Sequence, residues 1–301
     1  MSVVRIHDPR FTRLMIGHAN LEKLWTGGRW LEGPAYFPAG RYLVFSDIPN
    51  DRLLRFDEMS GQVSVFWPGC GFHNGHARDQ QGRLVCCEHL ARVVSRIEHD
   101  GSRRVLASHW QGKRFNSPND VIVAPDGAIW FSDPTYGIDG DYEGEKAESE
   151  IGASNVYRLD PETGAVEAVV TDRVKPNGLA LSPGGQFLVV ADTGRTHRPE
   201  LDATLTRYRL DAEGRPIQPG ETFATLADGF FDGFRFDAEG NLWSSAGRFV
   251  HCHGPDGALG LTIEIGEIVG NLCFGGSKGN RLFICAQTSL YSLFVNARGA
   301  T

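Results

Sequence analysis

Residues 119–135 read NDVIVAPDGAIWFSDPT, and residues 177–193 read NGLALSPGGQFLVVADT. In both stretches an Asn opens a strand-like run, a turn containing Gly follows eight residues after the Asn, and a second strand-like run ends next to an Asp. Two apolar runs separated by a Gly turn are typical of a β-hairpin. The chain therefore contains the same hairpin at least twice.

The same register occurs four more times, always with a polar residue eight positions before a turn glycine. Successive turn glycines are 39 to 58 residues apart, which leaves room for four short strands in each unit. We therefore predict an all-β fold, a six-bladed β-propeller with four-stranded antiparallel blades. The turn glycines are Gly40, Gly82, Gly127, Gly185, Gly240 and Gly279, and their polar partners are Glu32, Asn74, Asn119, Asn177, Asp232 and Asn271.

The ends of the chain indicate how the propeller closes. Residues 21–27, LEKLWTG, form a strand-like run without a hairpin of their own, and the last repeat ends soon after residues 289–295. We expect this N-terminal strand to complete the sixth blade and to cover its open edge. Residues 1–301 then form a single propeller domain, with residues 1–20 as an N-terminal extension.

Composition and charge exclude several classes of partner. The formal net charge is −7 without a run of Lys or Arg, which excludes a polyanionic nucleic acid. No apolar stretch approaches the roughly 20 residues that cross a bilayer, and residues 1–15 do not resemble a signal peptide. We expect a soluble, cytoplasmic protein without a membrane partner, and the oligomeric state stays open. The six cysteines lack a CxxC pair, so we expect buried free thiols rather than three disulfides.

Strand geometry places the six polar residues on one face of the propeller, close to its axis. Carboxylate and amide oxygens suit Ca²⁺, Mg²⁺ or Mn²⁺ better than structural zinc. The alternative is that these residues cap strand ends and hold ordered water, but that role does not require the two acids Glu32 and Asp232. Carboxylates one strand further out are expected to orient the ring, and these are Asp47, Glu88, Asp133 and Asp192.

The rim of the face is predicted to bind the substrate. Two long inserts, residues 134–154 and 193–203, border it, and the acidic run at 139–150 in the first insert is interpreted as a solvated face. His73, Asn74, Arg114 and Tyr136 are candidates for hydrogen bonds to a polar substrate.

Other motifs have structural interpretations. The GxSxG string at 275–279 occupies a hairpin turn and lacks the helix that follows a nucleophilic serine. His251 and His253 face the same side of a strand and are interpreted as a packing pair, with zinc binding as the alternative. His76 and His89 are expected to be structural.

Short motifs in a fixed order resemble the senescence marker protein/gluconolactonase family, which includes regucalcin. The resemblance implies a six-bladed propeller with a divalent metal in its central channel. It places Glu32, Asn177 and Asp232 at metal-ligating positions, and Asn119 at a position that contacts substrate or serves as a fourth ligand. The motifs are EGP at 32–34, FSD at 45–47, NSPND at 116–120, FSDP at 131–134, PNGL at 176–179, DG at 232–233 and CFGG at 273–276.

The strings NSPND and CEH are similar to the bacterial gluconolactonase branch of that family. Ser117 stands where the animal branch has a substrate-binding Arg, so the substrate cannot be carried over from the animal enzymes. Within the bacterial branch, the resemblance implies a lactonase.

The expected function is hydrolysis of a sugar lactone, similar to gluconolactone, to the aldonic acid. The metal would polarise the carbonyl, Asp232 would activate water, and Asn119 would position the lactone. Ca²⁺ is the expected cofactor, with Mg²⁺, Mn²⁺, Zn²⁺ and Fe²⁺ as alternatives. Two other functions stay open: a phosphotriesterase resembling the squid-type fluorophosphatase, and a non-enzymatic binding propeller of the NHL or YWTD kind.

Overall fold

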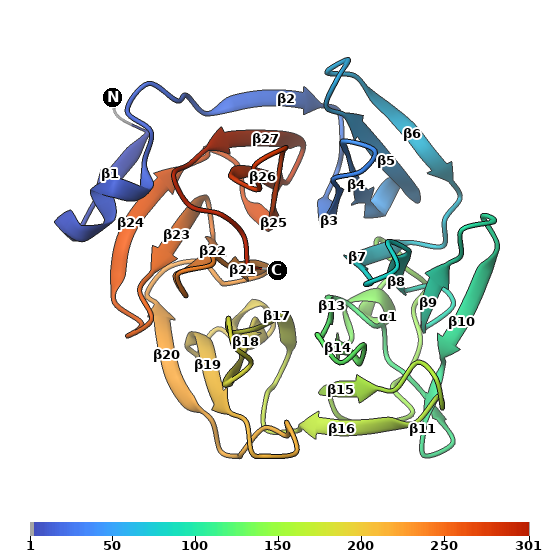
Figure 1. Cartoon of the computed structure of the whole chain (residues 1–301). Coiled ribbons are helices and arrows are strands. Elements are labelled where there is room, and N and C mark those ends of the chain that lie inside the picture. Colours follow the sequence, from blue (N-terminus) through green and yellow to red (C-terminus); the bar gives the residue numbers. More distant parts are fainter. Residues whose placement is uncertain (1–2, 301) are drawn as a thin grey trace.

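Figure 1 shows six small β-sheets arranged around a central axis, in a computed structural model that describes residues 3–300. Each sheet is antiparallel, and its strands follow one another in chain order from the axis outward, except that β1 and β2 are the outermost strands of the last two sheets. The prediction of an all-β, six-bladed propeller with four-stranded blades is confirmed.

In the first three blades each sheet is formed by four consecutive strands of the chain. Blade 1 contains β3 (Leu31–Phe37), β4 (Tyr42–Asp47), β5 (Arg52–Asp57) and β6 (Val63–Pro68). Blade 2 contains β7 (His73–Arg78), β8 (Leu84–Glu88), β9 (Val93–Ile97) and β10 (Arg103–Ala107). Blade 3 contains β13 (Val121–Val123), β14 (Ile129–Asp133), β15 (Asn155–Leu159) and β16 (Val166–Val170).

The last three blades follow the same plan, except that blade 6 takes one strand from the N-terminal region. Blade 4 contains β17 (Pro176–Leu181), β18 (Phe187–Asp192), β19 (Ala203–Arg209) and β20 (Glu221–Leu226). Blade 5 contains β21 (Phe234–Phe236), β22 (Leu242–Ala246), β23 (Phe249–His253) and β24 (Leu259–Glu264). Blade 6 contains β25 (Val269–Gly275), β26 (Arg281–Ala286), β27 (Ser289–Phe294) and β2 (Glu22–Thr26).

The remaining elements are short and lie outside the four-stranded pattern. A separate hairpin follows blade 2, one α-helix follows β14, and three 3₁₀ helices occur in loops. These elements are β11 (His109–Trp110), β12 (Lys113–Arg114), α1 (Tyr136–Asp139), η1 (Pro9–Leu14), η2 (Ile48–Asn50) and η3 (Gly194–Thr196).

The N-terminal region closes the ring as the sequence predicts. Strand β2 pairs with β27, from Glu22 opposite Ser292 to Thr26 opposite Ser289, and forms the outer edge of blade 6 (Figure 1). The extension before β2 is also held against the blades. Strand β1 (Val4–Ile6) pairs with β24 as a fifth strand of blade 5, and η1 buries Phe11 and Leu14 in the apolar cluster between blades 5 and 6.

The repeated turns use left-handed backbone as expected at five of the six turn glycines. Their φ angles lie between 66° and 86°, from Gly279 to Gly127. The first turn differs, because the positive φ of 49° falls on Arg41 rather than on Gly40. The GxSxG string lies in such a turn, between the end of β25 and the start of β26, as predicted.

The core consists of apolar layers between neighbouring blades. Cys86 packs with Val44 of blade 1, whereas Cys87 packs with Phe131 of blade 3, because adjacent side chains of a strand point to opposite faces. All six cysteines are buried and free, which confirms the prediction from their spacing.

Candidate metal centre and active site

The six register positions lie near the start of the innermost strand of each blade, with Asn119 and Asp232 two residues before β13 and β21. Five of them line a single cavity of about 190 Å³ at the axis: Glu32, Asn74, Asn119, Asn177 and Asp232. Asn271 instead donates a hydrogen bond from Nδ2 to Glu32 Oε2 at 3.1 Å. The cavity is also lined by Trp30, Tyr136, Glu143, Thr193, Thr196 and Phe230.

Glycine after the register residue allows the blades to approach closely at the axis. A Cβ atom on Gly178 would lie 2.1 Å from the backbone oxygen of Asp232, and one on Gly33 would lie 2.0 Å from that of Asn74. Such distances are far inside van der Waals contact, so only glycine fits without a shift of the neighbouring blade. Close packing between blades therefore explains why Gly follows the register residue in the strings EG, NG and DG.

The two acids of the ring are almost fully buried, Glu32 with 3% and Asp232 with 7% of its surface exposed. Burial raises the pKa of both carboxyls, and the mutual repulsion of the pair raises that of Asp232 further. None of the described residues that line the cavity is a Lys or an Arg. The site thus concentrates negative charge without a cationic side chain to balance it.

The ring also presents oxygen atoms that lack protein donors. Asn74 Nδ2 donates to His89 Nε2 at 3.3 Å, which leaves the buried Oδ1 of Asn74 without a hydrogen-bond partner. Two carboxylates and several amide oxygens around one cavity form a donor set of the kind that hard divalent cations bind. The residues therefore fit a metal ion of this class.

The outer carboxylates hold the backbone that leads into the ring, rather than the ring side chains. Asp47 accepts from the backbone N–H of Arg29 at 2.9 Å, and Asp133 accepts from that of Ser117 at 2.8 Å. Asp192 accepts from the backbone N–H of Lys175 at 2.9 Å. Glu88 differs, because it pairs with Arg103 at 2.6 Å. Three of these four carboxylates therefore hold loop backbone next to the ring.

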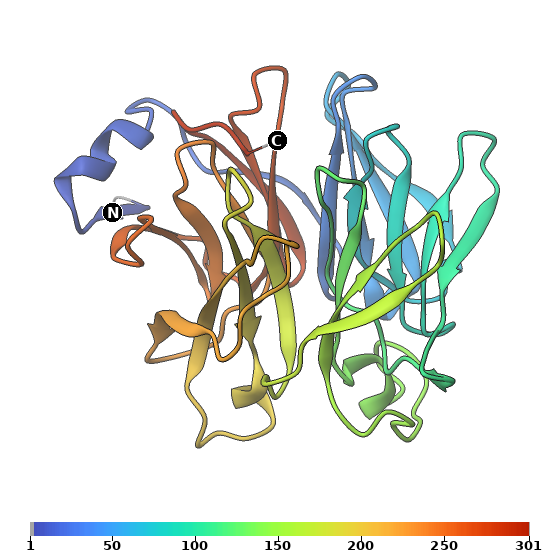
Figure 2. The same cartoon turned by 60° about the horizontal axis from the view of Figure 1, so that its bottom comes forward.

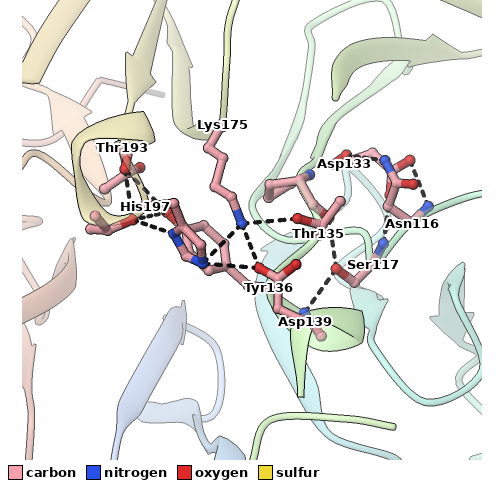
Figure 3. A network of polar contacts seen from close by, with 12 residues as sticks. Asn116, Ser117, Asp133, Thr135, Tyr136, Asp139, Lys175, Thr193 and His197 are labelled. Atoms are coloured by element: carbon pink, nitrogen blue, oxygen red, sulfur yellow. Dashed lines mark hydrogen bonds and ion pairs between the residues drawn. The ribbon is translucent and has the colours of Figure 1, made fainter. Parts of the chain in front are cut away.

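Two inserts form the rim of the cavity, and they project from the same end of the propeller (Figure 2). Figure 3 shows how they are joined around Lys175. The Nζ atom of Lys175 donates to Thr135 Oγ1 at 2.9 Å and to Asp139 Oδ2 at 2.5 Å, and lies 3.3 Å from His197 Nε2. It also lies 4.3 Å from the centre of the Tyr136 ring, so that one buried ammonium group fixes this wall of the cavity.

Ser117 fixes the start of α1. Its Oγ atom donates to the backbone oxygen of Pro134 at 2.7 Å and accepts from the N–H of Gly137 at 2.9 Å (Figure 3). Tyr136, which the sequence places at the rim, thereby lies against the cavity.

Two candidate substrate-binding residues, His73 and Arg114, do not line this cavity. His73 is fully buried and packs edge-on against Trp67, because its neighbour Asn74 points inward and adjacent strand residues alternate. The Nη2 atom of Arg114 donates to the backbone oxygen of Ala91 at 3.1 Å, away from the axis. The expectation that both contact the substrate is not supported by this geometry.

The sequence interpretation missed Glu143. The acidic run at 139–150 was expected to be a solvated face, but Asp139 pairs with Lys175, and Glu143 lines the cavity. Burial, and then the charge of Asp139, raises the pKa of Glu143 to about 7. No pattern in the sequence distinguishes Glu143 from its acidic neighbours, because the insert occurs once and has no periodicity.

Two histidine groups lie outside the cavity. Ligand atoms of His73, His76 and Cys86 lie within 4.8 Å of one another, yet all three residues are enclosed in the wall between blades 1 and 2. His76 Nδ1 is bonded to the backbone oxygen of Gly33 at 2.9 Å. His251 and His253 contact each other with ring centres 5.7 Å apart, in keeping with a packing pair.

The structure also bears on the relation to a membrane. In the part of the chain that the structure describes, the helices are too short and too polar to cross a bilayer.

Comparisons with known proteins agree with this architecture. A gluconolactonase from Zymomonas mobilis is 30% identical over 303 residues, which cover 93% of this chain and 82% of that protein. The solved structure of a gluconolactonase from Xanthomonas campestris is 37% identical, with a TM-score of 0.90, and the match covers 98% of this chain and 95% of that one. The calcium-binding regucalcin of Agrobacterium tumefaciens, at 21% identity, has a TM-score of 0.76 over 93% of this chain and 95% of its own, and shares the fold. Residues 30–288 match the SMP-30/Gluconolactonase/LRE-like region, and the chain belongs to this family.

Proposed function

We propose that this chain is a metal-dependent lactonase that opens a sugar lactone to the aldonic acid, with the whole chain acting as one propeller domain. The observation that carries the proposal is the convergence of five oxygen-bearing side chains on one axial cavity. The names of the Zymomonas and Xanthomonas relatives support a lactone as substrate.

In this proposal Glu32, Asn177 and Asp232 hold the metal, and Asn119 is the fourth ligand or contacts the substrate. When bound, a divalent cation would polarise the lactone carbonyl and stabilise the negative charge that develops on its oxygen. We propose Ca²⁺ as the resident ion, because the donors are hard oxygens and the regucalcin neighbour is described as calcium-binding.

Asp232 is the general base in this proposal. Its buried carboxylate takes a proton from the water molecule that attacks the carbonyl carbon. Asn74, Asn119 and Tyr136 border the same cavity and are placed to meet the hydroxyl groups of a sugar lactone. The aromatic rings of Trp30 and Phe230 supply apolar surface that excludes water around the reacting bond.

The test is hydrolysis of glucono-δ-lactone by wild type and by Asp232→Asn, with the spontaneous rate subtracted. We expect kcat to fall about 10²–10⁴-fold, as for loss of a general base. Asp228→Asn is the matched control, because Asp228 is exposed and outside the cavity. Circular dichroism checks that both variants fold.

The outcome separates the other functions. Full activity of Asp232→Asn would exclude Asp232 as the general base. Hydrolysis of a fluorophosphate but of no lactone would favour a phosphotriesterase, and hydrolysis of neither by wild type would favour a binding propeller.

A further inference from the structure

The insert at residues 134–154 directs one carboxyl group, that of Glu143, to the axial cavity. Glu143 lines the cavity together with Glu32 and Asp232. Its carboxyl forms no hydrogen bond or ion pair within residues 3–300, whereas Asp139 of the same insert is paired with Lys175. An unpaired carboxyl next to the substrate space is available for chemistry.

The position of Glu143 is fixed by its backbone. His89 Nδ1 contacts the backbone oxygen of Glu143 at 2.8 Å, while His89 Nε2 accepts from Asn74 in the ring. Burial lowers the pKa of His89 to about 4, so the neutral ring donates from one nitrogen and accepts at the other. The next residue, Gly144, is packed so tightly that a Cβ atom would lie 2.1 Å from the backbone oxygen of Gly137.

The titratable groups that face Glu143 are three carboxyl groups and one histidine. They are the carboxylates of Glu32 at the start of β3, Asp232 before β21 and Asp139 on α1, with the neutral His89 behind the backbone. Burial and Asp139 cause the raised pKa of Glu143, and the ring acids are not among its causes.

Apart from Glu32, two carboxyl groups line the cavity, those of Asp232 and Glu143, and their environments differ. A cation bound by the ring would favour the charged form of Asp232, whereas Glu143 is not a residue of the ring and burial is the main cause of its raised pKa. A pair of carboxyls in such contrasting surroundings divides acid and base roles.

We propose that Glu143 is a catalytic acid that protonates the ring oxygen of the lactone as the carbon–oxygen bond breaks. This inference rests on the proposed lactonase function. Water adds to the carbonyl carbon while Asp232 takes one of its protons. When the bond between the carbonyl carbon and the ring oxygen breaks, the electron pair stays on that oxygen, which takes the proton of Glu143. The product is the hydroxy acid, and both carboxyls then exchange protons with solvent.

The test compares Glu143→Gln with wild type on three lactones. Glucono-δ-lactone and δ-valerolactone release an alkoxide, which needs a proton, whereas dihydrocoumarin releases a phenolate, which leaves without one. We expect kcat/KM to fall about 10²-fold on the first two, a usual loss for an acid catalyst, and to fall much less on dihydrocoumarin. Glu145→Gln, an exposed neighbour in the same insert, is the control and should match wild type.

A pH profile on glucono-δ-lactone gives a second measurement. Wild type should lose kcat/KM as the pH rises above about 7, because Glu143 then loses its proton, and Glu143→Gln should lack this alkaline fall. Wild-type rates in Glu143→Gln, or an unchanged alkaline fall, would overturn the proposal. A loss confined to glucono-δ-lactone would show that Glu143 binds sugar hydroxyls instead. Wild type that is inactive on all three lactones would contradict the lactonase function itself.

Discussion

The oxygen ring and the rim above it are built in different ways. Each ring residue occupies the same register position of a repeated blade and lies in or just before the innermost strand of that blade. The rim comes from two inserts that occur once each, and contacts between blades hold it, above all those of Lys175. The repeat therefore supplies oxygen-bearing side chains at equivalent positions, and the inserts supply side chains of other kinds.

The two regions also differ in how their polar atoms are satisfied. Ring atoms such as Asn74 Oδ1 lack protein partners, while the Lys175 ammonium group has Thr135 and Asp139 as hydrogen-bond acceptors. The unpartnered Oδ1 of Asn74 can meet a ligand, whereas the ammonium group of Lys175 is already satisfied within the protein. Changes in the ring should therefore affect ion binding and catalysis, and changes at Lys175 should affect substrate affinity.

The largest effect is expected from removing the metal. Chelation should reduce lactone hydrolysis to the spontaneous rate, and added Ca²⁺ should restore it. It should also lower the thermal unfolding temperature, because an ion that binds only the folded state stabilises it. Calorimetric titration should show weaker Ca²⁺ binding by Glu32→Gln. A chelated protein with full activity and an unchanged unfolding temperature would contradict a metal in the ring.

A methyl group between two blades should have the next largest effect. In Gly178→Ala the new Cβ would meet the backbone of Asp232, so we expect unfolding to require about 1–3 kcal/mol less free energy, as in overpacked cores. Urea denaturation measures this change. Gly17→Ala is the control, since no atom lies within 4 Å of its Cβ position and its φ is not in the left-handed region. Equal stability of the two variants would show that the blades are not packed as described.

The smallest effect is expected at the rim. Lys175→Met removes the hydrogen bonds to Thr135 and Asp139 and the contact of the ammonium group with the Tyr136 ring, and hydrogen bonds to charged groups contribute about 1.5–3 kcal/mol each. If part of this lost free energy weakens substrate binding, KM rises about tenfold, with little change in kcat or in ion affinity. Steady-state kinetics and calorimetry measure these quantities, and Lys146→Met, at an exposed residue of the insert at 134–154, is the control. A fall in kcat at constant KM would place Lys175 in the chemistry instead.

Residue periodicity explains what could be predicted from the sequence. Six copies of one hairpin revealed the propeller, and the register placed Glu32 and Asp232 at the axis because strand geometry is local. The alternation of side chains along a strand also shows why His73 could not accompany Asn74 into the cavity. Glu143 and Lys175 could not be found in this way, since their placement depends on contacts between blades that no local pattern encodes.

The closure of blade 6 has a consequence for synthesis of the chain. Thr26 on β2 bonds to Ser289 on β27, a partner 263 residues later. Strand β2 therefore leaves the ribosome long before its partner exists and has an unpaired edge until β27 has been made. Blades 1 to 5 can form as they emerge, but the ring stays open during that time. The axial cavity needs residues on both sides of this gap, so the newly made protein gains its complete active site only with the last strand.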